Sequence, residues 1–358
     1  VAEQLLAGKI GAIVAIEPQT GEILTLASNP TWNPKLLVGK ERGKNYNILL
    51  KDPTKPMLNR ATQSSYPPGS TFKTVQALIG LQMGVITPHT QYACSGQRST
   101  PIKCTHSHGS PVALEEAIEQ SCNPYFWALY RDMLQQDGYD DGHTHFKEHY
   151  QAWREIVASF GLGEKFTNTD IREQAKGYLP TTEFYNRIYG QKGWKAITIR
   201  SLSIGQGEIL VTPLQLANQA AAIANKGYYI TPHFNRNDSM KSDTHRVLVD
   251  EQLFDVVHGG MARVMTDGTG RWYNVPELQI CGKTGTVQNP HGDDHALFIA
   301  FAPMDNPKIA VAVAVENAGF GSTWACPIAT MDIEQYLNGE IKRNALFESM
   351  CAADLITP

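Results

Sequence analysis

The order of apolar and polar residues at the start of the chain predicts a β-hairpin. Two β-branched runs, Gly11–Glu17 and Glu22–Ala27, are joined by a Pro-Gln-Thr-Gly turn. Residues 30–66 are rich in Pro, Asn, Lys and Gly without a sustained period, which predicts an irregular surface segment. A helical spacing of apolar residues then runs from Thr71 to Met83, directly before a glycine in the C-cap position.

The middle of the chain is mostly helical in pattern, and the last third alternates between helix and strand. Helices are expected at residues 114–120, 125–134 and 150–160, and a capping box at Thr212 starts another that ends near Asn225. After residue 240 the pattern predicts, in order, a helix at 251–265, strands at 278–288, 295–302 and 308–316, and a helix at 326–337.

Strands at both ends with helices between them indicate one sheet assembled from the two ends of the chain. We expect a single catalytic domain over residues 1–345, with an α/β part at about 11–75 and 245–340. Residues 76–244 form the expected helical part, and residues 346–358 form a C-terminal tail.

Composition narrows the possible functions. The 358 residues carry 31 Lys and Arg against 35 Asp and Glu, so no basic surface for nucleic acid is expected. A hydrophobic fraction of 42% excludes a disordered chain. The longest apolar runs, such as Ile309–Val315, are too short to cross a bilayer. Because the chain begins at Val1 without a leader pattern, we expect it to be part of a longer protein.

Ser70 and Lys73 stand three residues apart at a predicted helix start, so their side chains project from one helix face. A serine hydroxyl is a weak nucleophile unless a nearby base removes its proton, and a partly desolvated lysine is neutral enough to do so. The pair is therefore a candidate nucleophile and base, although a single match of this kind also arises by chance.

Two later motifs support this interpretation. Ser121-Cys122-Asn123 lies between two predicted helices, where Ser121 could relay a proton and Asn123 could bind a lysine or a substrate amide; a helix cap is the alternative. The segment 283–286, Lys-Thr-Gly-Thr, lies in a strand-like run, where Gly285 would admit a ligand backbone beside a cation and hydroxyls. An exposed turn is the alternative for this segment.

Each of the three motifs occurs once, and together they are the signature of penicillin-binding proteins and class A β-lactamases. The sequence resembles the transpeptidase domain of class B penicillin-binding proteins over nearly its whole length, most closely the branch called penicillin-binding protein 2 of the rod-elongation machinery. The resemblance rests on the stretches GAIVAIEPQTGEIL, LNRATQSSYPPGSTFK, AIEQSCNPYFWAL, SIGQGEILVTPLQLANQAAAIANKG and GKTGTVQNPHGDDHALFIAFAPMDNPKIAVAVAVENAGFG.

The resemblance implies a fold and a reaction. The implied fold is α/β: a mainly antiparallel sheet built from both ends of the chain and flanked by helices, with a mostly helical subdomain inserted. The implied enzyme is a peptidoglycan D,D-transpeptidase that crosslinks stem peptides and is acylated by β-lactam antibiotics. Its nucleophile, Ser70, attacks the penultimate D-Ala carbonyl, expels the terminal D-Ala, and passes the acyl group to an amine of a neighbouring strand.

The resemblance also implies roles for the motif residues. Lys73 activates Ser70, while Ser121 relays a proton and Asn123 orders the site. Backbone N–H groups of Ser70 and Thr286 form the oxyanion hole. The substrate carboxylate, or that of a β-lactam, is received by the motif on the late strand, namely the catalytic Lys283 with Thr284, Gly285 and Thr286. The acyl transfer itself requires no cofactor. Weaker candidates for contact with the substrate are Tyr66, His291, His295 and Trp324.

Proteins of this class are anchored in the inner membrane by an N-terminal helix followed by a non-catalytic pedestal, and neither is in this chain. The resemblance therefore implies work at the periplasmic face of the inner membrane. It implies partners in the elongation complex, above all a membrane glycosyltransferase, reached through the full-length protein.

Cysteines and histidines near the second motif indicate a further site. Sulfur and imidazole ligands favour tetrahedral zinc, and the resemblance implies a structural zinc site whose last ligand is Cys122. The expected imidazole is that of His108 rather than His106, and Cys94 and Cys104 complete the set. Such an ion would hold the loop that carries the Ser-x-Asn motif. A Cys94–Cys104 disulfide, with Cys122 a small buried residue, is the alternative.

Two other functions share these motifs. A serine β-lactamase also needs a base for deacylation, and only Glu164, four residues before Asn168, has the spacing of that base. Its surroundings lack the Pro and Leu of the lactamase loop, so we interpret Glu164 as a surface residue. A non-catalytic β-lactam sensor or scaffold is the other alternative, and the intact motif set argues against it.

Overall fold

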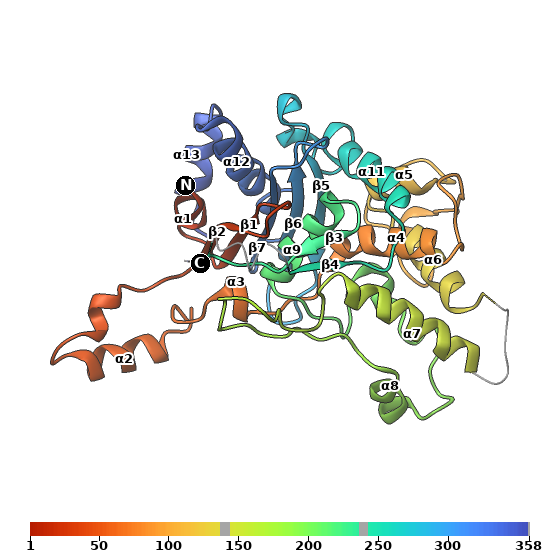
Figure 1. Ribbon diagram of the computed structural model, residues 1–358, viewed down its shortest axis with the longest axis horizontal. Helices are drawn as coiled ribbons and strands as arrows, with labels where there is room; N and C mark the ends of the chain where they lie inside the picture. Colours follow the sequence, from red (N-terminus) through yellow and green to blue (C-terminus); the bar gives the residue numbers. More distant parts are fainter. Residues whose placement is uncertain (137–143, 236–242, 357–358) are drawn as a thin grey trace.

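The computed structural model describes residues 1–136, 144–235 and 243–356. Its centre is a five-stranded sheet with the order β2-β1-β7-β6-β5, in which every neighbouring pair is antiparallel (Figure 1). The strands are β1 (Gly11–Ile16), β2 (Ile23–Asn29), β5 (Cys281–Val287), β6 (His295–Ala302) and β7 (Ile309–Val315). The predicted α/β fold, with an antiparallel sheet built from both ends of the chain, is confirmed.

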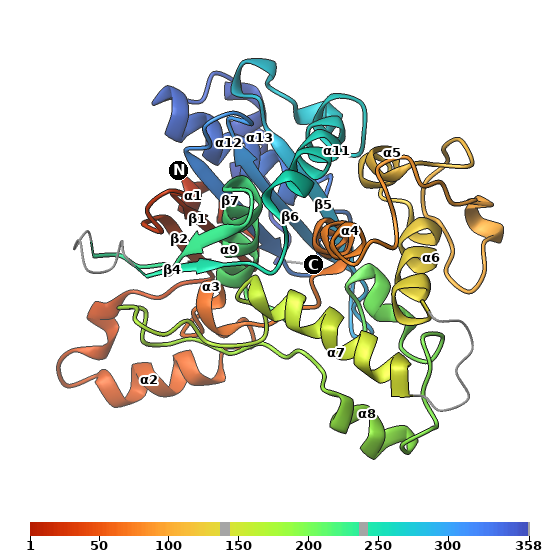
Figure 2. The ribbon, with the colours of Figure 1, turned by 45° about the vertical axis from the view of Figure 1, so that its right-hand side comes forward.

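The pairing of β1 with β7 brings the two ends of the chain together in the middle of the sheet. Gly11 lies opposite Val315, and the register continues to Ile16 opposite Ala310. Every residue of β1 and of β7 is buried, which requires that both faces of the sheet be covered. Helices α9 (Pro213–Ala224) and α11 (Phe254–Thr266) cover one face, and α12 (Ala325–Asn338) with α1 (Ala2–Leu6) covers the other (Figure 2).

The C-terminal segment contains a helix, α13 (Asn344–Ala352), that packs on α1. The buried Lys9 amine fastens the two ends together, because it donates hydrogen bonds to the carbonyl oxygens of Met350 (2.5 Å) and Ala353 (3.1 Å).

Helix α9 begins with the predicted capping box, in which the Thr212 hydroxyl accepts from the N–H of Gln215 and the Gln215 side chain accepts from the N–H of Thr212. All twelve residues of α9 are buried, so its polar side chains need partners. Gln219 donates to the Thr71 carbonyl (3.0 Å) and the Thr74 hydroxyl (3.2 Å). Helix α9 thereby holds the start of the helix that follows the first motif.

A mostly helical region lies beside the β5 edge of the sheet (Figure 2). Its helices are α4 (Lys73–Gln82), α5 (Leu114–Glu119), α6 (Asn123–Leu134), α7 (Thr144–Ser159) and α8 (Thr182–Tyr189). A buried aromatic cluster joins α6, α7 and α8, in which Trp153 stacks on Tyr150 and meets Tyr130 edge to face, while Tyr150 meets Tyr185 edge to face. The two short strands β3 (Tyr228–Ile230) and β4 (Thr244–Arg246) pair separately.

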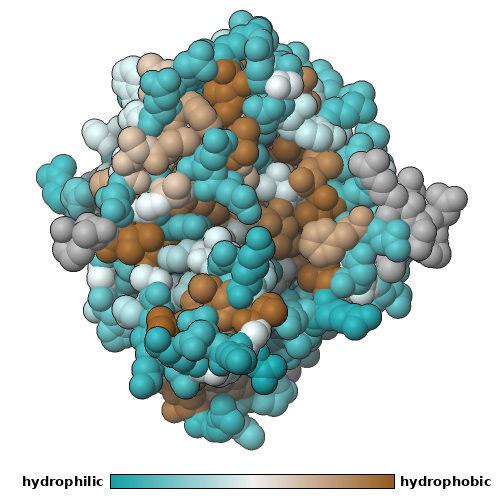
Figure 3. All heavy atoms as spheres, turned by 90° about the vertical axis from the view of Figure 1, so that its left-hand side faces the viewer, coloured by the Kyte–Doolittle hydropathy of each residue, from teal (hydrophilic) through white to brown (hydrophobic). Residues whose placement is uncertain are grey.

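Residues 30–66, predicted to be irregular, contain two helices, α2 (Arg42–Lys51) and α3 (Arg60–Gln63). Helix α2 projects from the body (Figure 1) and leaves Tyr46, Ile48 and Leu50 exposed. Since the helix has almost no core to face, its apolar residues show no helical period, and the sequence pattern missed it. Figure 3 views the molecule from this side and shows apolar residues scattered among polar ones.

Among the helices of residues 1–136, 144–235 and 243–356, none has both the length and the apolar character needed to cross a membrane.

The turn that carries Ser70 rests directly on a second turn at Gly205. The N–H of Gly69 donates to the Gly205 carbonyl (2.7 Å), and Gly205 itself has a left-handed backbone with φ +69°. A Cβ atom on Gly205 would lie 2.2 Å from the Gly69 carbonyl oxygen, a distance that requires one of the two turns to move.

We therefore expect Gly205→Ala to destabilise the fold well beyond the cost of its backbone angle. The left-handed angle alone costs about 1–2 kcal/mol, and the backbone clash raises the loss in unfolding free energy to about 3 kcal/mol or more. Gly339→Ala is the matched control, because Gly339 is also a left-handed C-cap but has no atom within 4 Å of its Cβ position. Equal losses in urea denaturation for the two variants would contradict the tight contact.

Candidate active site

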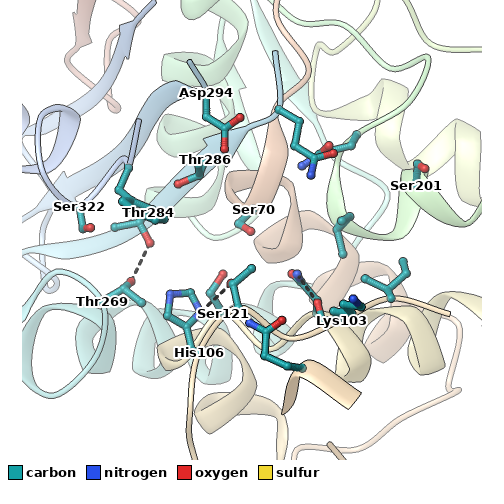
Figure 4. A pocket seen from close by; sticks show the side chains of 18 of the residues that line it. Ser70, Lys103, His106, Ser121, Ser201, Thr269, Thr284, Thr286, Asp294 and Ser322 are labelled. Atoms are coloured by element: carbon teal, nitrogen blue, oxygen red, sulfur yellow. Dashed lines mark hydrogen bonds between the residues drawn. The ribbon is translucent and has the colours of Figure 1, made fainter. Parts of the chain in front are cut away.

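The structure brings the three motifs to one cleft of about 510 Å³ (Figure 4). Ser70 comes from a 3-10 turn, η2 (Gly69–Phe72), and Ser121 and Asn123 come from the turn between α5 and α6. Thr284 and Thr286 come from β5. Lys73 and Lys283 are fully buried behind these residues. All five motif residues that line the cleft thus face one space, although they are up to 216 residues apart, from Ser70 to Thr286.

Two glycines allow η2 to pack closely on β5. A Cβ on Gly69 would lie 2.8 Å from Cγ2 of Val287, and a Cβ on Gly285 would lie 2.9 Å from Cγ2 of Thr71. Sequence analysis expected Gly285 to admit a ligand backbone. The space beside its Cα is instead filled by Thr71, so the glycine serves the contact between η2 and the strand.

The Lys73 amine makes three hydrogen bonds with residues of the second motif. Its Nζ donates to the Ser121 carbonyl oxygen (2.7 Å), the Ser121 hydroxyl (3.2 Å) and Oδ1 of Asn123 (2.5 Å). Burial removes water from the ammonium group and lowers the pKa of Lys73 to about 8, against the weaker opposing effect of the Cys122 and Cys104 thiols. At pH 7 roughly a tenth of Lys73 is therefore neutral, far more than of an ordinary lysine with a pKa of about 10.4, and this neutral amine can act as a general base.

Ser121 reaches this amine because its backbone is left-handed, with φ +53°. Helix α5 ends there, with the Ser121 N–H donating to Ile118 O (3.2 Å), and the turn directs both the carbonyl and the hydroxyl at Lys73. The Asn123 side chain is held at its other end, where Nδ2 donates to the Lys103 carbonyl (3.0 Å). A residue other than glycine in this conformation is strained, which is common where geometry serves a site.

Strand β5 lies at the edge of the sheet and, in the described part of the chain, pairs with β6 alone. Its free side can therefore accept an extended peptide as an added strand. The Thr284 hydroxyl is hydrogen-bonded to the Thr269 hydroxyl (2.6 Å) at one end of the cleft. Burial, and then the charge of Lys73, keep the pKa of Lys283 well below its usual range.

Beside the Ser121 turn, four side chains converge in the arrangement of a metal site. The ligand atoms of Cys94, Cys104, His108 and Cys122 all lie within 4.8 Å of one another. Nε2 of His108 is 3.3 Å from the Cys104 sulfur and 3.7 Å from the Cys94 sulfur. A tetrahedral zinc ion, with bonds of about 2.3 Å to sulfur and about 2.0 Å to nitrogen, separates such atoms by roughly 3.5 Å.

Hydrogen bonds with neighbouring groups orient these four side chains. Nδ1 of His108 donates to the Gly109 carbonyl (2.7 Å), so the lone pair of Nε2 faces the cluster. All four ligand residues fit zinc in type, and Cys94 and Cys104 are free thiols rather than the alternative disulfide. Hydrogen bonds, first from the Cys122 thiol and then from the N–H groups of His106 and Asn123, lower the pKa of Cys104 below its usual range, against the opposing effect of burial.

This cluster is connected to the cleft through Asn123. Its N–H donates to the Cys104 sulfur, its side chain bonds the Lys103 carbonyl, and its Oδ1 accepts from Lys73. The position of the cluster therefore sets the position of the second motif.

Sequence reasoning missed several residues of the cleft. Besides the motif residues, its walls include Lys103, His106, Arg200, Ser201, Thr269, Asp294 and Ser322 (Figure 4). These residues come from four loops and from the start of a 3-10 helix, η4 (Arg200–Ile204). None belongs to a motif with a chemical signature, so only the fold brings them together.

Some weaker candidates do not line the cleft. The Tyr66 hydroxyl donates to Glu316 (2.7 Å) and its ring packs against His295, while Trp324 is the N-cap residue of α12. Glu164, the one residue with the spacing of a lactamase base, is on the surface and pairs with Lys176 (3.3 Å), as its interpretation as a surface residue predicted.

Comparison with known proteins places this arrangement in a family. Residues 11–331 match the family described as penicillin binding protein transpeptidase domain. The peptidoglycan D,D-transpeptidase MrdA of Acinetobacter baumannii is 37% identical over 357 residues, which cover 91% of this chain and 50% of the relative. The chain thus spans about half the length of the curated relatives it matches.

Solved structures agree with this result. The crystal structure of Pseudomonas aeruginosa PBP2 in complex with WCK 5153 is 34% identical with a TM-score of 0.79, over 96% of this chain and 75% of that one. The Helicobacter pylori complex of penicillin-binding protein (PBP2) and MreC gives 26% identity and a TM-score of 0.80, over 95% and 62%. Since all three motifs of the cleft lie within the matched residues, the chain belongs to the penicillin-binding protein transpeptidase family, in its penicillin-binding protein 2 (MrdA) branch.

Proposed function

We propose that this chain is a serine-type peptidoglycan D,D-transpeptidase that works through an acyl-enzyme on Ser70. The observation that carries the proposal is the buried Lys73 amine, held by Ser121 and Asn123 three residues after Ser70 at the wall of a cleft. The name of the Acinetobacter relative, a peptidoglycan D,D-transpeptidase, supports the same reaction.

Acylation proceeds with Lys73 as the base. Neutral Lys73 accepts the hydroxyl proton of Ser70 while Ser70 Oγ attacks the penultimate D-Ala carbonyl of a stem peptide. The backbone N–H groups of Ser70 and Thr286 stabilise the oxyanion. Collapse of the intermediate breaks the peptide C–N bond, and the proton reaches the departing D-Ala amine by way of Ser121. An amine of a neighbouring strand then attacks the ester, loses its proton to the base, and releases Ser70.

The donor peptide binds as an added strand on the free edge of β5. Its terminal carboxylate lies against Thr284 and Thr286, whose hydroxyls donate to it, and against Lys283, whose charged form the carboxylate favours. A β-lactam carries a carboxylate and a reactive amide in a similar arrangement, so it enters the same cleft and acylates Ser70. The ester then persists, because Glu164 lies outside the cleft, paired with Lys176.

The full-length protein acts at the periplasmic face of the inner membrane, where peptidoglycan strands are made. The curated relatives are about twice as long as the part matched here, which leaves room for an anchor and a pedestal. Its partners are a membrane glycosyltransferase and other elongation-complex proteins. The Helicobacter pylori PBP2 complex with MreC supports such an assembly.

The four-residue cluster beside Ser121 binds a structural zinc ion through Cys94, Cys104, His108 and Cys122. Bound there, zinc supplies a fixed tetrahedral junction for its ligands. Within the chain, the N–H of Asn123 donates to the Cys104 sulfur and so holds the second motif in place.

Intact-mass analysis with a penicillin and with a D-Ala-D-Ala stem peptide tests the reaction. The wild-type chain gains one persistent penicillin adduct and forms crosslinked peptide, while Ser70→Ala does neither and keeps its fold. Ser349→Ala is the control, because Ser349 is an exposed residue of α13 outside the cleft wall. An adduct lost quickly indicates a β-lactamase, an adduct without crosslinking indicates a sensor, and an adduct on Ser70→Ala contradicts Ser70 as nucleophile.

The rate of acylation by penicillin depends on the protonation state of Lys73. Because the neutral amine is the base and its pKa is about 8, the second-order rate constant rises with pH and levels off above that value. Well below it, the rate changes by about tenfold per pH unit. Stopped-flow measurements from pH 5.5 to 9.5 check this. A flat profile, or a rate that falls as pH rises through 8, would contradict Lys73 as the base.

Purified without added reductant or chelator, the chain carries one equivalent of zinc by elemental analysis. Cys122→Ser and His108→Ala each fall below about a tenth of an equivalent, because a tetrahedral structural site needs all four ligands. Cys351→Ser, distant from the cluster, retains the metal. Less than a tenth of an equivalent in the wild-type chain, together with oxidised Cys94 and Cys104, would overturn the zinc assignment in favour of a disulfide.

A further inference from the structure

The charged groups around the cleft are divided between its two ends. Lys73 and Lys283 are buried behind Ser70 and Ser121, and Lys103 and Arg200 stand in the wall on the side of the helical region. Among the wall residues in the described part of the chain, Asp294 is the one carboxylate. It stands at the opposite end, beside Thr286, with its carboxylate turned into the pocket (Figure 4).

Backbone contacts hold Asp294 in this position. Its carbonyl oxygen accepts from the N–H of Gly319 (2.8 Å). The next residue, His295, begins β6 opposite Val287 and accepts a hydrogen bond from the N–H of Asn317 (3.1 Å). Asp294 is therefore anchored at the end of the β5–β6 pair, where a peptide added along β5 passes as it leaves the cleft.

The carboxylate itself is free to bind a ligand. Within residues 1–136, 144–235 and 243–356, no hydrogen bond or ion pair engages its side-chain oxygens. Glu316, by contrast, is paired with both Arg60 (2.9 Å) and Tyr66 (2.7 Å). A half-buried carboxylate without such a partner attracts a cation from the ligand.

We propose that Asp294 is a subsite for a primary ammonium group of the stem peptide. The inference rests on the proposed transpeptidation, because that reaction brings amine-bearing peptides into this cleft. Lys103 and Arg200, the cations in the wall on the side of the helical region, repel an ammonium group and attract a carboxylate, whereas Asp294 does the reverse. The two ends of the cleft together fix the direction in which a peptide with both charges lies along β5.

The ammonium group has two sources. It belongs either to a side chain of the donor, upstream of the D-Ala-D-Ala end, or to the acceptor strand whose amine attacks the acyl-enzyme. Both are primary ammonium groups that a carboxylate binds in the same way, and kinetic measurements separate them.

The donor arm compares two peptides that end in D-Ala-D-Ala, one with a free side-chain amine and one with that amine acetylated. Wild-type enzyme prefers the free amine, and in Asp294→Asn the ratio of the two acylation rates falls about tenfold, as expected for loss of one charge-assisted contact. Asp293→Asn is the matched control, because Asp293 is an exposed neighbour outside the cleft wall.

The acceptor arm uses an amine-free thioester donor and measures how the acyl-enzyme divides between hydrolysis and transfer to an amine-bearing peptide. If the subsite serves the acceptor, Asp294→Asn lowers the ratio of transfer to hydrolysis about tenfold, and added salt lowers the wild-type ratio more than that of the variant. A fall in either arm, absent from Asp293→Asn, supports the subsite and identifies its source.

The proposal is overturned if both ratios in Asp294→Asn stay within twofold of wild type, or if Asp293→Asn lowers them equally. If the wild-type chain forms no acyl-enzyme from any donor, both the Asp294 subsite and the proposed function are wrong. If the acyl-enzyme forms but both ratios are unchanged in Asp294→Asn, only the Asp294 subsite is wrong.

Discussion

The site depends on keeping one amine, Lys73, out of water and in place. Burial makes the charged form costly, and three hydrogen bonds from Nζ to Ser121 and Asn123 compensate for the lost water. Those acceptors exist because α5 ends in a strained left-handed residue and α6 begins two residues later. Many features far from the cleft, including the contact of α9 with the start of α4, serve to hold this geometry.

The second constraint is how closely a helix start can approach a strand. Gly69 and Gly285 let η2 lie against β5, so that Ser70 and the two threonines of the strand share one cleft. This contact also depends on the two ends of the chain, because the pairing of β1 with β7 completes the sheet whose free edge is β5. The position of Ser70 and the free edge of β5 therefore depend on the same antiparallel sheet.

The Cys/His cluster and the cleft are connected through one residue, Asn123. Asn123 connects them through its backbone N–H, which bonds the Cys104 sulfur, and through its side chain, which joins Lys73 to the Lys103 carbonyl. At the other end of the cleft, Asp294 is held by backbone bonds alone, which leaves its carboxylate available.

The sequence alone determined most of the elements that face the core and the candidate chemistry. Its apolar periods located the hairpin, the late strands and the capped helix at Thr212, because these elements face a core and so carry a regular pattern. Its motifs, with their resemblance to a family, identified Ser70, Lys73 and the four candidate ligands. Only the tertiary structure decided that helix α2 forms without a core to face, that Gly285 admits Thr71, and that Asp294 stands in the cleft wall. These features depend on contacts between distant segments, which a local pattern does not encode.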